Sequence, residues 1–245
     1  MSKQHILVKL GWERYNAPME NQVHFVDDKE ANTFLNDLKH FPHAYVLACC
    51  MDRQMKAEVA WMIPYRICQI FGDFSMKTLV SKSKSDYVKV FRKYKLHRFT
   101  DNMGEVFYDA VQRIHKNYAD DASNIWKGKP SSATVVYRFL EFSGVGIKIA
   151  TMATNILARQ YKIKFSDYYS IDVSPDVHVR RVMYRMGLVD KDASNDKILY
   201  KARELCPEFP GIIDYSLWLL GRTTCKAGNV DCGNCLVKKE CVRCK

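Results

Sequence analysis

The sequence lacks any apolar run that approaches the roughly 20 residues of a membrane-spanning helix. Its amino terminus, MSKQHILVKLGWERYN, contains too short an apolar segment for a secretory signal. Repeats with the period of a solenoid are absent, and so are low-complexity segments. We therefore expect a soluble intracellular protein of the cytoplasm, nucleoid or nucleus, with no membrane partner.

Apolar and polar residues rarely alternate along the chain, although such alternation marks half-buried strands. Most long segments instead repeat apolar residues at intervals of three and four, the spacing of one helical face. We expect an all-α fold. The expected helices are Asp28–Lys39, His43–Met62, Pro64–Gly72, Lys77–Tyr94, Asn102–Tyr118, Ser132–Phe142, Ile147–Gln160, Val177–Met186, Asp196–Leu205 and Gly211–Leu220.

The chain has 245 residues, which is enough for one large core or two modest ones. The polar, turn-rich stretch Tyr161–Pro175 is the longest break in the helical pattern, and we expect the passage between two helical lobes there. The expected division is a helical barrel domain at residues 41–165 and a second lobe formed by residues 1–40 and 166–245.

The chain has fewer acidic than basic residues, with 27 Asp and Glu and 38 Lys and Arg, which give a net charge of +11. Such a balance favours an anionic partner, with nucleic acid first and an acidic membrane surface second. The stretch Lys77–Arg98 is the most basic, with aromatic residues interleaved at Tyr87, Phe91 and Tyr94. It suits a face that follows phosphates, and it equally suits a solvated helix whose aromatics belong to the core.

Nine cysteines are present, and five of them fall at the carboxyl end. Intracellular thiols are kept reduced, so this density indicates metal ligation or catalysis rather than disulfides. Cys225, Cys232, Cys235 and Cys241 have the spacing C-x6-C-x2-C-x5-C, which suits a 4Fe-4S cluster. Zinc is the alternative, with Cys232, Cys235, Cys241 and Cys244 as ligands. Zinc sites usually have more residues between their two cysteine pairs than this grouping has, and it leaves Cys225 without a role.

The stretch LEFSGVGIKIA, Leu140–Ala150, places Gly144, Val145 and Gly146 between two helical patterns. Glycines two residues apart allow a tight turn and leave the backbone amides accessible. The following helix presents free N–H groups and the positive end of its dipole, so this turn can seat a phosphate without reading sequence. Glycine also ends helices for ordinary reasons, and the turn alone is weak evidence.

The hairpin, then PDVHVRRV, then the cysteine spacing occur in an order that resembles the endonuclease III branch of the helix-hairpin-helix DNA glycosylases. The resemblance extends from about His43 to Cys241, with the helix-hairpin-helix at about residues 132–160. It implies a DNA-binding cleft between the two lobes and an iron-sulfur cluster. The family's functional residues map onto Lys148 as nucleophile, Asp176 as essential carboxylate, Cys225, Cys232, Cys235 and Cys241 as metal ligands, and Gln54, helped by Arg53, as the side chain that fills the gap left by an extruded base.

The chemistry explains why an amine and a carboxylate belong together. Breaking an N-glycosidic bond builds positive charge on the sugar, which the Asp176 carboxylate can stabilise while it accepts a proton from the nucleophile. The Lys148 amine can attack C1' and form a Schiff base, which permits elimination of the 3' phosphate. Lys148 also suits a phosphate contact, and Asp176 also suits a helix N-cap after Pro175. Asp172 is a second candidate carboxylate outside the motif.

Four features depart from the family pattern. Ser143 stands where the hairpin usually has proline, and about ten extra residues separate Lys148 from Asp176. An extra amino-terminal segment and Cys244 have no counterpart in the family. These departures bear on the choice of substrate more than on the reaction.

The expected function is base-excision repair, with a glycosylase that removes a damaged or mismatched base and also cleaves the abasic site. The expected partner is duplex DNA with a lesion, mismatch or abasic site, bound by a monomer. Two alternatives stay open: a glycosylase without lyase activity, in which Asp176 activates water, and a non-catalytic iron-sulfur protein that binds DNA. The sequence does not name the excised base.

Overall fold

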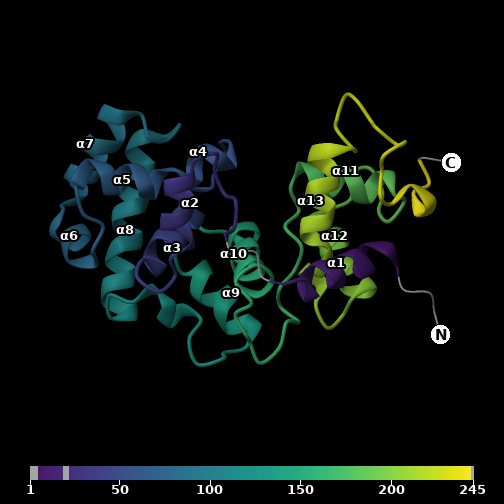
Figure 1. The fold of residues 1–245 in the computed structure, drawn as a ribbon, viewed down its shortest axis with the longest axis horizontal. Helices are drawn as coiled ribbons and strands as arrows, with labels where there is room; N and C mark the ends of the chain where they lie inside the picture. Colours follow the sequence, from purple (N-terminus) through teal and green to yellow (C-terminus); the bar gives the residue numbers. More distant parts are fainter. Residues whose placement is uncertain (1–4, 19–21, 244–245) are drawn as a thin grey trace. The chain divides into compact units, whose positions relative to one another are not determined.

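The structure is a computed structural model that describes residues 5–18 and 22–243 (Figure 1). Within these ranges every regular element is a helix, and the only β pairing is an isolated bridge between Cys225 and Val230. The all-α prediction is therefore confirmed. The elements are α1 (Ile6–Asn16), α2 (Lys29–Asn36), α3 (Pro42–Met51), α4 (Ala57–Trp61), α5 (Ile63–Phe71), α6 (Met76–Ser81), α7 (Lys84–Tyr94), α8 (Thr100–Tyr118), η1 (Ala122–Ile125), α9 (Ser132–Leu140), α10 (Ile147–Arg159), α11 (Val177–Arg185), α12 (Asn195–Leu205), η2 (Pro210–Ile213), α13 (Asp214–Thr223) and η3 (Lys238–Glu240).

Short polar side chains begin many of these helices by accepting hydrogen bonds from free backbone amides. Asp28 caps α2, Ser75 caps α6 and Ser194 caps α12. Ser83 and Asp86 form a capping box at the start of α7, in which each side chain accepts from the other residue's backbone amide. These caps fix where the helices begin.

Two expected helices are each divided in the structure. The pattern at His43–Met62 is interrupted between the end of α3 at Met51 and the start of α4 at Ala57. The pattern at Lys77–Tyr94 is interrupted at Lys82 and Ser83, because the capping box starts a new helix there. The helix α1 was not expected at all, and its packing against η2 supplies the stability that its sequence pattern does not.

Contacts group the residues into two compact units, each described by itself. The hairpin unit comprises Glu20–Gly128 and Tyr137–Ile149, and the cysteine unit comprises Met1–Met19, Lys129–Val136 and Ala150–Lys245, as far as these are described. The helices α9 and α10 contribute residues to both units.

The bounds of these units differ from the expected domain bounds. Residues 20–40 group with the hairpin unit, and residues 150–165 group with the cysteine unit. Contact grouping does not measure independent folding, so the division into residues 41–165 and residues 1–40 with 166–245 stays a prediction.

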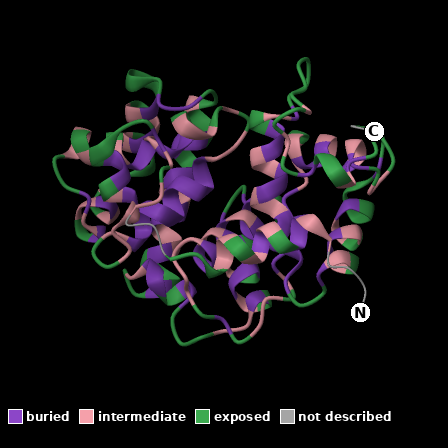
Figure 2. Cartoon of the chain, turned by 45° about the vertical axis from the view of Figure 1, so that its right-hand side comes forward, coloured by how far each residue is buried: buried purple, intermediate pink, exposed green. Residues whose placement is uncertain are grey.

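The core of the hairpin unit is rich in aromatic side chains. Tyr45, Tyr87, Phe91 and Phe107 are fully buried, and α7 packs along α8. Most helices carry both buried and exposed residues and present one face to a core, whereas α3 is buried along its whole length (Figure 2). None of the described helices is both long enough and apolar enough to cross a membrane.

The cysteine unit is organised around α13. The helix α11 packs against α13, while α1 and α12 both pack against η2, which directly precedes α13. Phe209 is fully buried among the rings of Trp12, Tyr15 and Tyr168. After α13 the chain continues as an irregular segment that carries the terminal cysteines (Figure 1).

Candidate functional site

The hairpin turn follows the end of α9 at Leu140 and leads directly into α10. Gly144 has a φ of +75°, a conformation that favours glycine, and the buried side chain of Val145 anchors the turn in the core. Lys148 is exposed in the first turn of α10. The sequence-predicted glycine turn and its lysine therefore lie on one surface of the hairpin unit.

Gly146 has no neighbour that explains why the residue is glycine. A Cβ atom built there would meet nothing within 4 Å, and its φ is outside the left-handed range. Neither packing nor backbone conformation therefore requires glycine at this position. Close approach of a ligand to the backbone amides at the start of α10 gives a reason for it.

The loop after α3 carries Gln54 and contacts the hairpin through Arg53. Gln54 is exposed and has a φ of 50°. The preceding residue, Arg53, is half-buried, and its guanidinium lies against Gly144, where an added Cβ would collide with Nη1 and lie 3.1 Å from Cζ. Arg53 and the turn, which are far apart in the sequence, are thus brought together, whereas the sequence pattern had placed Arg53 and Gln54 inside a helix.

Asp176 is the N-cap of α11. Its Oδ1 accepts hydrogen bonds from the backbone amides of His178 and Val179, both at 2.8 Å. The side chain is half-exposed, and Oδ2 accepts no hydrogen bond from the described residues. One carboxylate oxygen is therefore used in capping, while the other is available. Asp176 belongs to the cysteine unit and Lys148 to the hairpin unit, and the approach of one to the other stays a prediction.

Asp172 has a structural partner. It is 4% exposed and accepts two hydrogen bonds from Arg203, with Nε to Oδ1 at 2.8 Å and Nη2 to Oδ2 at 2.7 Å. Both of its oxygens are thus engaged by one guanidinium. This arrangement disfavours Asp172 as an alternative to Asp176.

The basic stretch Lys77–Arg98 divides into core and surface positions. Tyr87 and Phe91 are fully buried, so these aromatic rings are core residues and not platforms for bases, while Tyr94 is 44% exposed. Two of the cations have acidic partners in α8, Lys84 with Asp109 and Arg92 with Asp101. The exposed cations of the stretch include Lys77, Lys89, Lys93, Lys95 and Arg98.

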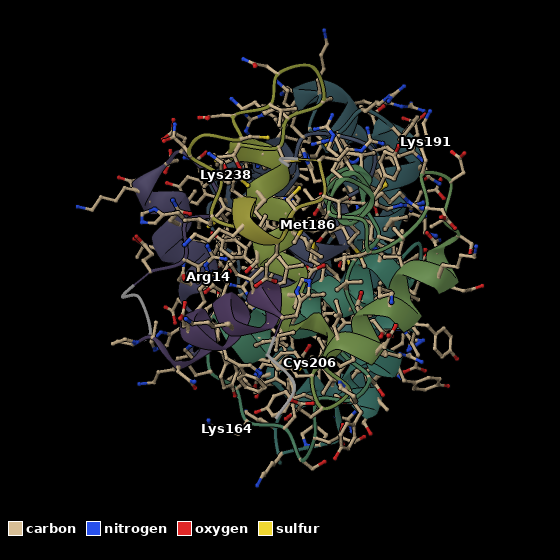
Figure 3. The ribbon with its side chains drawn as sticks, turned by 90° about the vertical axis from the view of Figure 1, so that its right-hand side faces the viewer. Arg14, Lys164, Met186, Lys191, Cys206 and Lys238 are labelled. Atoms are coloured by element: carbon tan, nitrogen blue, oxygen red, sulfur yellow. The ribbon has the colours of Figure 1, made fainter. Side chains whose placement is uncertain are left out.

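Cys225, Cys232, Cys235 and Cys241 all line one cavity of about 260 Å³ in the cysteine unit. Figure 3 labels Met186 of the cavity wall and Lys238 of the segment that carries the cysteines. Within residues 5–18 and 22–243, no three His, Cys, Asp or Glu side chains are gathered closely enough to hold one metal ion. Cys244, the fourth ligand of the zinc alternative, lies outside the described residues.

Two polar groups of the cavity suit a sulfur-rich metal group. Arg185 of α11 donates from Nη1 to Cys225 Sγ at 3.4 Å, and also to the carbonyl oxygen of Lys226 at 2.7 Å. Thr224 lines the cavity with a buried hydroxyl that has no hydrogen-bond partner among the described residues. A cation and an unused donor beside four thiols fit an anionic iron-sulfur centre. The sequence pattern indicated neither Arg185 nor Thr224 as part of this site. Arg185 lies one helical turn after Arg181 on α11.

Arg181 and Glu240 also hold the segment that carries the cysteines, through hydrogen bonds with backbone groups. Arg181 donates from Nε to the Cys225 carbonyl at 2.9 Å and from Nη2 to the Gly221 carbonyl at 2.8 Å. Glu240 accepts from the backbone amide of Ile6 at 3.2 Å, at the start of α1. The cysteine segment is therefore held from both α11 and the amino-terminal helix.

Solved structures with a similar fold include an endonuclease III and DNA glycosylases. An endonuclease III in a non-covalent complex with DNA matches with a TM-score of 0.63 at 15% identity, over 97% of this chain and 92% of that chain. A thermostable thymine-DNA glycosylase matches with a TM-score of 0.63 at 13% identity, over 98% and 95%. An 8-oxoguanine glycosylase/lyase of Clostridium acetobutylicum, in complex with double-stranded DNA, matches with a TM-score of 0.56 at 18% identity, over 74% and 59%.

No protein-family model and no curated protein matches the sequence. At identities of 13% to 18%, similarity to these structures establishes the fold and leaves the activity open. The chain has the fold of the helix-hairpin-helix DNA glycosylases, and the resemblance expected from the sequence is confirmed at that level.

Proposed function

We propose that the protein is a DNA glycosylase of base-excision repair that acts on duplex DNA containing a damaged or mismatched base and also cleaves the resulting abasic site. The observation that carries this proposal is the hairpin turn. Gly144 is needed for the turn, Gly146 is needed by neither packing nor conformation, and Lys148 is exposed directly after them. We expect the protein to act as a soluble monomer inside the cell.

The hairpin supplies a grip on the DNA backbone. The amides at the start of α10 and the exposed Lys148 both favour a phosphate, and neither distinguishes one base from another. With a net charge of +11, the chain adds a long-range attraction that weakens with salt. Such a grip leaves recognition of the base to the pocket that receives it.

Base removal requires charge stabilisation at the sugar. As the N-glycosidic bond breaks, the base leaves with the bonding electrons and the deoxyribose becomes positively charged. The available oxygen of Asp176 stabilises that charge, while its other oxygen stays fixed by α11. The Lys148 amine attacks C1', Asp176 takes the proton lost by the amine, and the leaving base is protonated from solvent.

The resulting lysine adduct explains the second activity. The nitrogen lone pair of this adduct then expels O4', which takes up a proton, so the C1'–O4' bond breaks, the sugar opens and an iminium joins Lys148 to C1'. The iminium acidifies C2', so loss of a C2' proton expels the 3' phosphate and cuts the strand. Hydrolysis of the remaining imine releases Lys148 unchanged.

We propose that Cys225, Cys232, Cys235 and Cys241 hold a 4Fe-4S cluster, with zinc as the alternative. When bound, the cluster supplies covalent cross-links within a segment that is too short and polar to build its own core. Arg185 compensates the negative charge of the thiolates from α11. The shared cavity, the Arg185 contact and the unused Thr224 hydroxyl support this assignment.

A glycosylase without lyase activity is a second candidate, favoured by the exposure of Lys148. An exposed lysine at a hairpin turn serves well as a phosphate contact, and then Asp176 activates a water molecule instead. Both candidates remove a base. They differ in whether the strand is cut without alkali.

The test is a panel of duplexes, each with one lesion, mismatch or abasic site, scored for strand cleavage with and without alkali. We expect cleavage without alkali for at least one substrate. Cleavage that appears only with alkali would assign the second candidate, and no release from any duplex would contradict both. Lys116→Gln, which changes an exposed lysine of α8, serves as the matched control for variants of Lys148.

A further inference from the structure

Arg53 connects the hairpin turn with the loop that carries Gln54. Its guanidinium lies against the backbone of Gly144, and its Nη1 donates to the sulfur of Met103 at 4.0 Å, near the start of α8. Arg53 thus contacts two segments of the hairpin unit, while its own backbone determines the position of the next residue. A planar guanidinium fits against a residue without a side chain, whereas the tetrahedral ammonium of lysine lacks that shape.

The loop is also supported from behind by His97. This side chain is 3% exposed, and its Nδ1 accepts from the backbone amide of Phe99 at 3.0 Å. Burial is the main cause of its lowered pKa, while the backbone groups of Met51 and Arg53 act in the opposite direction. The imidazole therefore lies near the backbone at the end of α3, although its Nε2 makes no hydrogen bond with the described residues.

The loop backbone is tightly turned. The backbone amide of Asp52 donates to the carbonyl oxygen of Cys49 at 3.2 Å, and the backbone amide of Arg53 donates to the carbonyl oxygen of Met51 at 2.8 Å. Gln54 then has a φ of 50°, a conformation that a residue other than glycine holds only when its surroundings impose it. The contacts of Arg53 with Gly144 and Met103 hold the residue that directly precedes Gln54.

We propose that Arg53 is a positioning residue that couples the hairpin turn to Gln54, so that seating a DNA phosphate on the turn and holding Gln54 against the DNA are one event. The inference rests on the proposed function, because it takes Gln54 as the side chain that fills the gap left by an extruded base. A simple phosphate contact by Arg53 would act independently of Gln54. If Arg53 were only a phosphate contact, the losses of affinity from changing Arg53 and Gln54 would multiply. If Arg53 positions Gln54, changing Arg53 has little further effect once Gln54 is replaced.

The first experiment uses the protein without DNA. Hydrogen exchange is measured for the backbone amides of residues 52–56 and 143–146 in the wild type, Arg53→Lys and the control Arg66→Lys, an exposed arginine of α5. We expect Arg53→Lys to speed exchange in both segments by about tenfold, since local opening of the two is linked. Faster exchange in one segment alone would overturn the coupling.

The second experiment uses a duplex with a tetrahydrofuran abasic analogue opposite 2-aminopurine, which reports on the disturbed stack. Arg53→Lys keeps the charge, so the dependence of affinity on salt should stay unchanged. In the wild-type background we expect about a tenfold weaker affinity, and in the Gln54→Ala background less than about a twofold change. Equal losses in both backgrounds would show that Arg53 acts independently of Gln54.

The two experiments separate this inference from the proposed function. If no duplex loses a base but both results hold, the proposed function fails and the coupling stands. If base removal is found and exchange in the two segments is unlinked, the coupling fails and the proposed function stands. If the protein does not bind the duplex, the exchange experiment decides the coupling by itself.

Discussion

The Asp176 side chain can serve two functions, because each of its two carboxylate oxygens can make a separate interaction. Oδ1 caps α11 through the amides of His178 and Val179. The cap fixes the position of Oδ2 relative to a rigid helix, as a catalytic carboxylate requires. Local sequence was sufficient to predict this cap, since Pro175 precedes the residue and a helical pattern follows it.

Replacement of Asp176 separates the two roles. Asp176→Asn retains a good N-cap and loses the charge, so we expect base removal to slow by at least about a hundredfold with little change in melting temperature. Asp176→Ala loses both and should also destabilise the fold by about 1 kcal/mol. Single-turnover excision and thermal unfolding measure these effects. Full activity in Asp176→Asn would exclude the charge from the mechanism.

The buried histidines predict how stability depends on pH. Burial lowers the pKa of His43 and of His97 below the ordinary value of 6.5, although the hydrogen bond from His43 to the Phe74 carbonyl opposes the shift. Below pH 6.5 the unfolded chain therefore binds protons that the folded chain does not. Stability should fall as the pH drops from 7 to about 5 and stay level between about 7 and 8, above which the raised pKa of the buried thiols Cys49, Cys50 and Cys206 lowers it again. Thermal unfolding across this range, with His43→Phe showing a weaker decline, tests the assignment; an unchanged profile would contradict it.

The contacts of Arg53 could not be predicted from the sequence. The residue lies in a run whose apolar spacing continues through the loop, because Met51 and Met55 keep the helical interval. Its partner, Gly144, is distant in the chain and has no side chain to signal a contact. Long-range packing of this kind leaves no periodic pattern.

At the scale of single elements, apolar periodicity predicted that helices exist more reliably than where they end. The division at Lys82 and Ser83 had a local signal, since Ser83 followed by Asp86 is a capping box. The division after Met51 had none, because Arg53 holds that loop through contacts with Gly144 and Met103, which are distant in the sequence. The helix α1 likewise depends on packing against η2.

The capping box at α7 gives a prediction about stability. In the structure Ser83 Oγ accepts from the amide of Asp86 at 3.2 Å, and Asp86 Oδ2 accepts from the amide of Ser83 at 3.0 Å. Ser83→Ala should lower the free energy of unfolding by about 1 kcal/mol. Lys93→Ala, at an exposed position of the same helix away from the cap, is the control and should change it by less than about 0.5 kcal/mol. Equal effects in chemical denaturation would contradict the role of the cap.

The hairpin element gives a prediction that separates binding from folding. Gly146→Ala should leave the melting temperature unchanged, because the added methyl meets no atom within 4 Å. Its affinity for duplex DNA should fall by at least about tenfold, since the methyl stands where the backbone must approach a phosphate. Gly144→Ala should instead destabilise the protein, as its φ of +75° strains any other residue. Unchanged affinity in Gly146→Ala would show that no DNA phosphate approaches the backbone at Gly146.

At the scale of the whole molecule, the sequence predicts a domain at residues 41–165 and a second lobe from residues 1–40 and 166–245, and this division stays a prediction. In the structure, residues 22–40 group with the hairpin unit and residues 150–165 with the cysteine unit. The polar stretch Tyr161–Pro175 was a visible boundary signal, while the contacts that recruit residues 22–40 join segments distant in sequence. The cysteine spacing, by contrast, is local and was readable without the structure.

Metal content tests the assignment of the cysteines. With a 4Fe-4S cluster, the purified protein should absorb near about 400 nm, and chelation should lower its melting temperature. Cys225→Ser should then lose the metal, while Cys244→Ser should keep it. Zinc bound through Cys244 would give the opposite pattern, without visible absorbance.

The central claim is that Lys148 and Asp176 act on the same deoxyribose. Borohydride reduction during reaction with duplex DNA containing an abasic site tests it most directly, because it fixes an iminium as a stable covalent complex. The wild type and Lys116→Gln should each yield a protein–DNA complex with the DNA attached at Lys148, Asp176→Asn should yield far less, and Lys148→Gln should yield none. A Lys148→Gln protein that is trapped as efficiently as the wild type would contradict the account.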